Sequence, residues 1–120
     1  MLNVALGGTL VQHIPDRLGE AVLHRGEGGV SVPHPVRVDP ASRLAGICGA
    51  SEFVVASLHH QGADRLGERL RPVAWAADGA VEAVELEGRP EVVAVQWHPE
   101  ITAARDATQQ RLFDWLVRRD

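Results

Sequence analysis

The sequence has little cysteine and no long apolar run: Cys48 is the only thiol among its 120 residues. A single thiol excludes an internal disulfide and any metal site built from several cysteines. No apolar stretch approaches the roughly 18 residues of a membrane-spanning helix, so no membrane segment is expected. The first residues also lack the basic segment that opens a signal peptide. Together these absences predict a cytoplasmic protein.

The chain contains no lysine, and all 12 of its basic residues are arginine. With 16 acidic residues the formal net charge is −4, which gives no reason to expect nucleic-acid binding, because that usually needs a basic patch. No internal repeat, low-complexity segment or phosphate-binding glycine motif is present. The length predicts one small domain over residues 1–120. No cofactor is expected.

The stretch 92–100, VVAVQWHPE, predicts a buried strand that ends in a histidine and a glutamate. Its unbroken apolar start is typical of a central strand covered on both faces. Pro99 ends the strand and restricts His98 to an extended backbone, so His98 and Glu100 should point the same way. The carboxylate can then accept the Nδ1 proton and leave Nε2 free as a general base. This is two-thirds of a nucleophile–His–acid triad whose nucleophile must come from elsewhere.

The remaining pattern alternates short helix and strand signals. We expect a short helix at 1–6 ended by Gly7-Gly8, a loop or marginal helix at 9–20, and a helical turn at 42–47. Strands are predicted at 36–38, 53–58, 70–76 and 81–86, the last two joined by a hairpin at Asp78-Gly79. In the second hairpin strand, Glu82 and Glu85 should face outward.

A final helix is expected over 102–119. Leu112, Phe113, Leu116 and Val117 fall on one side of it at helical spacing, which predicts a packed face, and Arg118 and Arg119 suit its C-terminal end.

Four segments in order, 2–12, 55–61, 78–84 and 95–112, resemble the class I glutamine amidotransferase superfamily, in particular its gamma-glutamyl-gamma-aminobutyrate hydrolase, or peptidase C26, branch. The motifs that carry the resemblance are LNVALGG near the start, SLHHQ at 57–61 and VQWHPE at 95–100. The resemblance implies an α/β fold, namely the C-terminal part of a flavodoxin-like class I glutamine amidotransferase domain with an incomplete sheet. In that branch a Cys-Arg-Gly-x-Gln nucleophile elbow precedes the first helix. We therefore expect that this sequence lacks the N-terminal half and the elbow.

The resemblance also implies roles for individual residues. His98 would be the catalytic base and Glu100 the acid that orients it, in a cysteine-dependent hydrolysis of gamma-glutamyl amides through a thioester. Ser57, His59, His60 and Gln61 would bind the substrate at a strand end, where α/β proteins tend to hold ligands. The alternative is a polar strand exit with surface histidines.

We expect no metal site. A zinc site at His59, His60 and His98 is disfavoured, because adjacent histidines in an extended segment point to opposite faces and rarely share one ion.

Cys48 is not predicted to be the nucleophile. An elbow needs a buried strand before the nucleophile and a helix after it, and Gly46–Ala50 has neither, so Cys48 is expected to be a small core residue.

The chain is then the C-terminal portion of a gamma-glutamyl amide hydrolase, inactive without the missing segment. The alternative is a non-catalytic remnant or binding module. An incomplete sheet predicts a homodimer, a complementing N-terminal chain or poor solubility, and the leaving amine is not identified.

Overall fold

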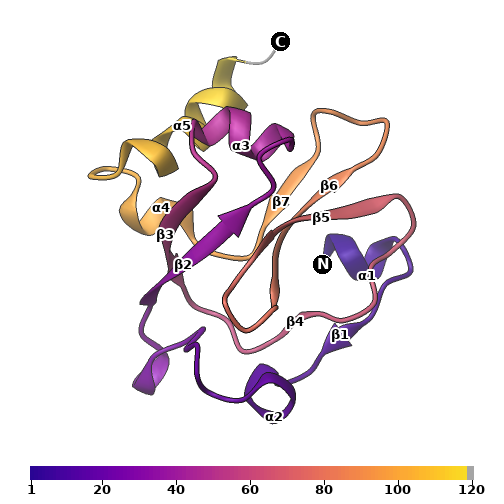
Figure 1. Ribbon diagram of the computed structural model, residues 1–120, viewed down its shortest axis with the longest axis vertical. Helices are drawn as coiled ribbons and strands as arrows, with labels where there is room; N and C mark the ends of the chain where they lie inside the picture. Colours follow the sequence, from indigo (N-terminus) through magenta and orange to yellow (C-terminus); the bar gives the residue numbers. More distant parts are fainter. Residues whose placement is uncertain (119–120) are drawn as a thin grey trace.

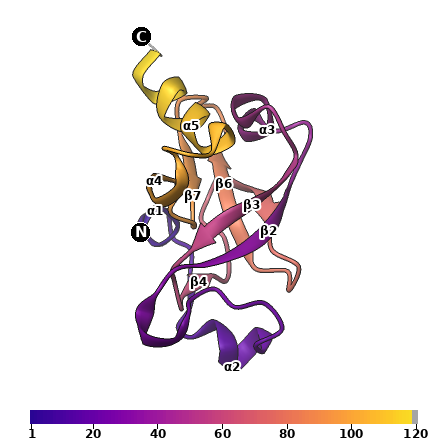
Figure 2. The ribbon, with the colours of Figure 1, turned by 90° about the vertical axis from the view of Figure 1, so that its left-hand side faces the viewer.

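The computed structural model of the chain describes residues 1–118, which form a mixed α/β structure around one five-stranded sheet. The strand order is β3-β2-β5-β6-β7, and within these residues every neighbouring pair is antiparallel. Helices α3 and α5 pack beside each other at one end, and α2 lies at the opposite end (Figure 1, Figure 2). The elements are α1 Leu2–Ala5, β1 Leu10–Val11, α2 Ile14–Leu18, a 3-10 turn Glu27–Gly29, β2 Val32–Val38, α3 Arg43–Cys48, β3 Glu52–Ser57, β4 Gly62–Ala63, β5 Leu70–Trp75, β6 Val81–Leu86, β7 Val93–Val95, α4 Pro99–Thr102 and α5 Ala107–Arg118.

The predicted hairpin is present, with β5 paired to β6 around the turn at Asp78-Gly79. Gly79 has φ +87°, a left-handed conformation that favours glycine. The Asp78 carboxylate accepts a hydrogen bond from the Ala80 amide at 3.0 Å, which fixes the turn.

The prediction that Glu82 and Glu85 face outward is wrong. Each residue is only 1% exposed, because the start of α3 covers Glu85 and three histidines from other segments cover Glu82. Glu85 Oε2 accepts a hydrogen bond from the Leu44 amide at 2.8 Å, at the start of α3, and Arg71 lies 3.1 Å from Oε1. Glu82 instead faces a group of histidines described below.

Strand β2 is longer than predicted and diverges from β5. Residues 32–37 pair with β3, but only Arg37 and Val38 pair with β5. Pro33 and Pro35 lie in the part that pairs with β3 alone, as expected for residues without an N–H. The separation leaves room beside buried His34 for side chains from other segments.

Two predictions for the C-terminal third need correction. Within the described residues β7 is an edge strand of three half-buried residues, not a central strand covered on both faces. The helix expected over 102–119 begins only at Ala107, as α5, and Thr102 instead ends the separate short helix α4. Asp106 caps α5 by accepting a hydrogen bond from the Thr108 amide at 3.0 Å. Leu116 and Val117 are 59% and 77% exposed, so they do not share a packed face with Leu112. Arg119 lies outside the described residues.

Segment 9–20, expected as loop or marginal helix, contains β1 and α2. Pro15 sits in the first turn of α2, where its missing N–H removes no helical bond. Strand β1 pairs with β4 as a separate two-stranded sheet.

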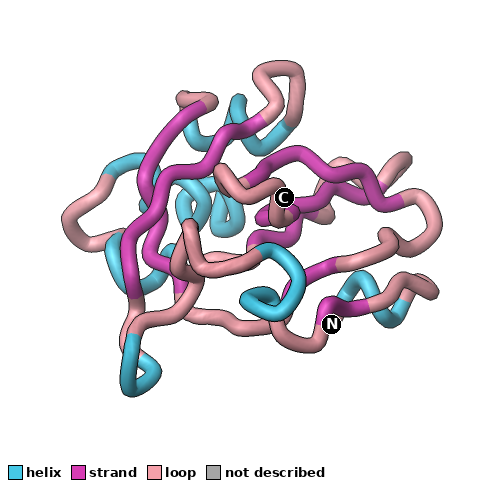
Figure 3. Tube along the Cα trace, turned by 60° about the horizontal axis from the view of Figure 1, so that its bottom comes forward, coloured by secondary structure: helices cyan, strands magenta, loops and turns pink. Residues whose placement is uncertain are grey.

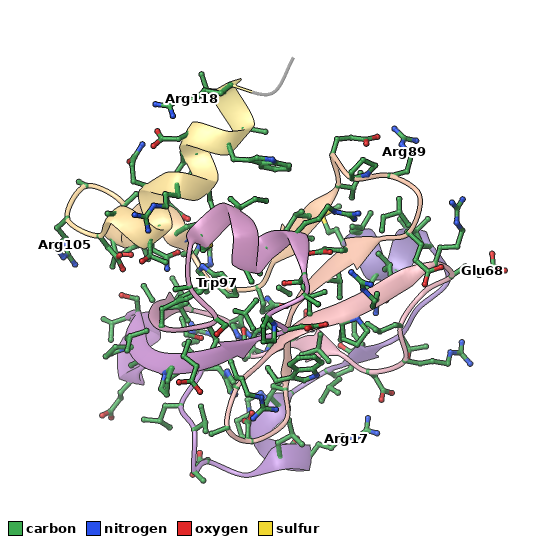
Figure 4. The ribbon with its side chains drawn as sticks, turned by 45° about the horizontal axis from the view of Figure 1, so that its top comes forward. Arg17, Glu68, Arg89, Trp97, Arg105 and Arg118 are labelled. Atoms are coloured by element: carbon green, nitrogen blue, oxygen red, sulfur yellow. The ribbon has the colours of Figure 1, made fainter. Side chains whose placement is uncertain are left out.

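The core fills the space between the five-stranded sheet and helices α3 and α5. It consists of Val36, Val38, Leu44, Ala45, Cys48, Val55, Val73, Ala74, Ala83 and Trp97. Trp97, labelled in Figure 4, is 2% exposed. Its ring meets that of Phe53 edge-to-face with the centroids 5.9 Å apart, and its indole N–H donates to Gln109 at 2.9 Å. Among residues 1–118, no helix has the length and apolar character needed to cross a membrane.

Candidate functional site

His98 is held where the chain leaves β7 and crosses to the end of β3. The Gln96 amide continues the pairing with β6 through the Glu82 carbonyl at 2.7 Å, and the His98 amide donates to the Ala56 carbonyl at 2.9 Å. Pro99 begins α4 and contributes no N–H. Two strands that are not adjacent in the sheet, β6 and β3, therefore fix the backbone on which the His98 side chain is carried.

The structure brings His98 and Glu100 together. His98 Nδ1 lies 2.8 Å from Glu100 Oε2, and the side chains are 39% and 59% exposed. Slight burial raises the pKa of Glu100, but the hydrogen bond with His98, a backbone hydrogen bond and the charge of the imidazole outweigh it and lower that pKa. The ionised carboxylate fixes the Nδ1–H tautomer. Within residues 1–118 the one side-chain hydrogen bond of the ring is through Nδ1, so Nε2 has no partner.

Helix α1 starts close to this strand end. Asn3 anchors the helix, because its side-chain amide donates to the carbonyls of Thr9 and Arg65 and its oxygen accepts from the Gly67 amide at 2.7 Å. A cavity of about 160 Å³ is lined by Met1, Leu2 and Asn3 on one side and by Ala94–Gln96 of the β7 segment on the other. The start of α1 thus lies beside the residues that lead to His98 (Figure 2).

Ser57 does not present its hydroxyl to a ligand. The residue is fully buried, and Oγ donates a hydrogen bond to the His24 carbonyl at 2.8 Å. The hydroxyl therefore ties the end of β3 to the loop that follows α2.

The two adjacent histidines point to different surroundings, as the extended backbone predicts. The His59 ring is 8% exposed and turns toward Glu82, whereas His60 is exposed and lies near the His13 ring at 5.7 Å. Gln61 is half-buried, and its side-chain amide donates to Gln12 at 3.1 Å. His59 and His60 line a cavity of about 620 Å³ beneath the loop after α2.

Three buried polar residues near His59 were missed by the sequence analysis. His24, His34, His59 and Glu82 each offer one potential ligand atom, and these atoms lie within 4.8 Å of one another. The sequence signal was an acidic residue, Glu82, inside an apolar strand, but strand alternation placed it outside. His24 and His34 lie in a glycine- and proline-rich stretch whose path could not be inferred.

The pKa shifts in this group follow from burial and close charges. Burial lowers the pKa of His24, but its contacts with Glu82 and Asp78 outweigh this effect and the pKa is raised. Burial raises the pKa of Glu82, but His24, His59 and His34 outweigh it and the pKa is lowered. Glu82 is therefore an ionised carboxylate inside the protein.

Cys48 is a core residue, as predicted. It is fully buried, and burial raises the pKa of its thiol to about 11 against the opposing charge of Arg111. We expect the native protein to resist iodoacetamide at neutral pH, because the thiol is neither exposed nor ionised. Intact-mass measurement should show labelling only in denaturant. Stoichiometric labelling of the folded protein would contradict this assignment.

Known proteins match this chain along nearly its whole length, and the matches name related families. The model of the peptidase C26 family matches residues 1–100. A Mycobacterium tuberculosis protein whose name provisionally describes it as a glutamine amidotransferase is 47% identical over 117 residues, covering 98% of this chain and 36% of that protein. The gamma-glutamyl-gamma-aminobutyrate hydrolase of Escherichia coli is 35% identical over 123 residues, covering 97% of this chain and 48% of that enzyme.

The architecture agrees with these sequence relationships. The crystal structure of a glutamine amidotransferase from Thermotoga maritima matches with a TM-score of 0.58 at 18% identity, covering 95% of this chain and 41% of that one. The fold is therefore that of part of a class I glutamine amidotransferase domain. The chain spans between 36% and 48% of the length of the two curated relatives.

Proposed function

The chain belongs to the peptidase C26 family, and on that premise we propose that it provides the histidine and the acid of a cysteine-dependent gamma-glutamyl amide hydrolase. The observation that carries the proposal is the His98–Glu100 contact at 2.8 Å, at a strand end beside the start of α1. A fixed Nδ1–H tautomer with an open Nε2 is the arrangement that a general base needs. The catalytic thiol would come from a segment outside these 120 residues, placed before α1.

Each chemical step assigns a defined task to the pair. His98 Nε2 takes the proton of the thiol, and the thiolate attacks the gamma-carbonyl carbon of the substrate. The C–N bond then breaks, and His98 returns the proton to the departing amine, which leaves a thioester. His98 next removes a proton from water, whose attack releases glutamate and restores the thiol. Glu100 holds the ring and stabilises the imidazolium in both halves of the reaction.

Substrate binding is assigned to the end of β3, through His60, Gln61 and the backbone from Ser57 to His59. His60 and Gln61 are not buried, and His59 and His60 line the cavity of about 620 Å³. One E. coli relative is named for hydrolysing gamma-glutamyl-gamma-aminobutyrate, which suggests the gamma-glutamyl group as the recognised part. We propose no particular leaving amine.

A second candidate is a non-catalytic module that keeps only the fold. It is favoured by the burial of Cys48, since the sole thiol of the sequence cannot reach His98 from the core. Reading the coding DNA upstream in frame separates the two functions. A Cys-Arg-Gly-x-Gln coding string supports the hydrolase, either in this gene or in a co-expressed one, and its absence from both favours the module.

A chimera tests the hydrolase directly. The part of the E. coli gamma-glutamyl-gamma-aminobutyrate hydrolase that precedes its match to Leu2 is joined to residues 1–120. We expect glutamate release from gamma-glutamyl-gamma-aminobutyrate, measured with glutamate dehydrogenase, because the chimera unites thiol and base. Residues 1–120 alone should release none. A folded, monodisperse chimera without activity would contradict the proposed function.

A further inference from the structure

A second polar group lies in the interior, separate from the His98–Glu100 pair. Its members come from four segments: His24 from the loop after α2, His34 from β2, His59 from the end of β3 and Glu82 from β6. His24, His34 and Glu82 are 5%, 5% and 1% exposed. Figure 3 shows the α2 end of the molecule, where the loop segments cross the sheet.

In each histidine, the ring nitrogen that points away from Glu82, here called the outer nitrogen, already has a hydrogen-bond acceptor. His24 Nε2 lies 2.6 Å from an oxygen of Asp78, His34 Nδ1 lies 3.0 Å from the Pro35 carbonyl, and His59 Nδ1 lies 2.8 Å from the Gln61 carbonyl. Because carbonyl oxygens cannot donate, the ring proton of His34 and of His59 must sit on Nδ1. The Asp78 oxygen at 2.6 Å is the corresponding acceptor for a proton on His24 Nε2.

The ring nitrogen of each histidine that faces Glu82, here called the inner nitrogen, therefore carries an unshared lone pair when the histidine is neutral. The inner nitrogens are His24 Nδ1, His34 Nε2 and His59 Nε2, at 3.1, 3.6 and 3.4 Å from Glu82 Oε1. Among the described residues, none of these three nitrogens and neither oxygen of Glu82 has a hydrogen-bond partner of acceptable geometry. Lone pairs and a carboxylate facing one another in a buried space are costly unless a proton or a metal ion lies between them.

We propose that His24, His34, His59 and Glu82 form a buried, four-coordinate zinc site that holds four segments of this fold together. Zinc bound at 2.0–2.2 Å to nitrogen and oxygen in a tetrahedron has ligands about 3.3 Å apart. The three separations from Glu82 Oε1 bracket that value.

Charge and ligand type support a divalent transition metal. Imidazole and carboxylate ligands suit zinc, whereas calcium and magnesium prefer oxygen ligands alone. Two buried carboxylates, Glu82 and Asp78, balance the charge of one divalent ion with all three histidines neutral.

The outer partners have the form of a second ligand shell. In metal sites the non-ligating ring N–H is usually held by a carboxylate or a carbonyl, which fixes the tautomer and the ring orientation. Asp78, Pro35 and Gln61 provide these acceptors here. Four protein ligands make the site closed and structural, so it is separate from the chemistry assigned to His98.

The site would also order the segment assigned to substrate binding. His59 precedes His60 and Gln61, and both His24 and His59 line the cavity of about 620 Å³. Exposed His13 and Glu20 line the same cavity, which gives an ion a route from solvent. The sequence-based expectation of no metal site is replaced by this proposal. That expectation had grouped His59 with His60 and His98, neither of which joins the cluster.

Metal content of the untagged protein tests the proposal. After the protein is loaded with zinc and passed through gel filtration, we expect inductively coupled plasma mass spectrometry to find about one zinc ion per chain. Loading with cobalt instead should give the visible absorption of tetrahedral Co²⁺ bound to nitrogen and oxygen. Glu82→Gln and, independently, His59→Asn should lower zinc retention at least tenfold, whereas His13→Asn, which alters an exposed histidine of the same cavity, should retain it.

Thermal unfolding provides a second measurement. Zinc should raise the Tm of the wild-type protein and of His13→Asn but not that of Glu82→Gln, because only a folded site binds the ion. If Glu82→Gln does not fold, His59→Asn supplies the comparison, since His59 is the least buried ligand. Two results would overturn the proposal: folded wild-type protein that retains less than about a tenth of an equivalent of zinc, or equal retention in the ligand variants. Neither result bears on the hydrolase, whose readout is glutamate release by the chimera.

Discussion

Replacing His98 by Asn in the active chimera is expected to lower kcat/KM for gamma-glutamyl-gamma-aminobutyrate by about 10²–10⁴-fold. Asn keeps a polar side chain at the strand end but cannot exchange a proton with the thiol or the departing amine. Because the His98 side chain is 39% exposed and packs little, its loss should leave the fold intact. Steady-state kinetics and far-UV circular dichroism of the same preparations measure both effects.

Glu100→Gln gives a matched comparison for the orienting acid. It removes the charge that accepts the Nδ1 proton and should produce a smaller loss in kcat than His98→Asn, because Glu100 acts through the imidazole. Glu68→Gln, which neutralises an exposed acid away from the site (Figure 4), should keep the activity of the parent chimera. A His98→Asn chimera within tenfold of its parent would exclude His98 as the base.

Trp97→Ala is expected to reduce the free energy of unfolding by about 3–5 kcal/mol. The indole is almost fully buried against Phe53, and its N–H is the donor to buried Gln109. Truncation therefore opens a cavity and also removes the hydrogen bond of a polar group that water cannot reach. Since a domain of this size is stabilised by about 5–15 kcal/mol in total, this loss is a large fraction of the whole stability.

Trp75→Ala is the control for that measurement. Trp75 is half-buried on β5, with the Arg37 guanidinium 5.8 Å from its ring, so its truncation should be distinctly less costly. Urea denaturation followed by far-UV circular dichroism compares the two without relying on tryptophan fluorescence. Equal losses for the two variants would show that Trp97 is not a central packing residue.

Local signals in the sequence were sufficient where neighbouring residues determine the geometry. The His98–Glu100 contact depends on two residues separated by one proline, and the β5–β6 hairpin depends on Asp78-Gly79. Both are present in the structure.

Signals failed where the geometry depends on which segments pack together. Alternation along β6 predicted an exposed Glu82, but the segments that carry His24, His34 and His59 pack against its side chain. The histidine cluster joins segments from residue 24 to residue 82, and no sequence period spans such separations. Conversely, the apolar run that forms β7 predicted a central strand, but within the described residues β6 is its one strand neighbour.

The prolines of β2 have a consequence for association between molecules. Backbone amides alternate along a strand: Val38 donates toward β3, to Ser51, and Asp39 donates toward β5, to Val73. Positions 33 and 35 share the direction of Asp39, so the stretch of β2 that diverges from β5 has no amide hydrogen at two successive sites on its unpaired side. A strand from a second molecule could not complete a regular ladder there, which protects this gap in the sheet from amyloid-like extension and domain exchange.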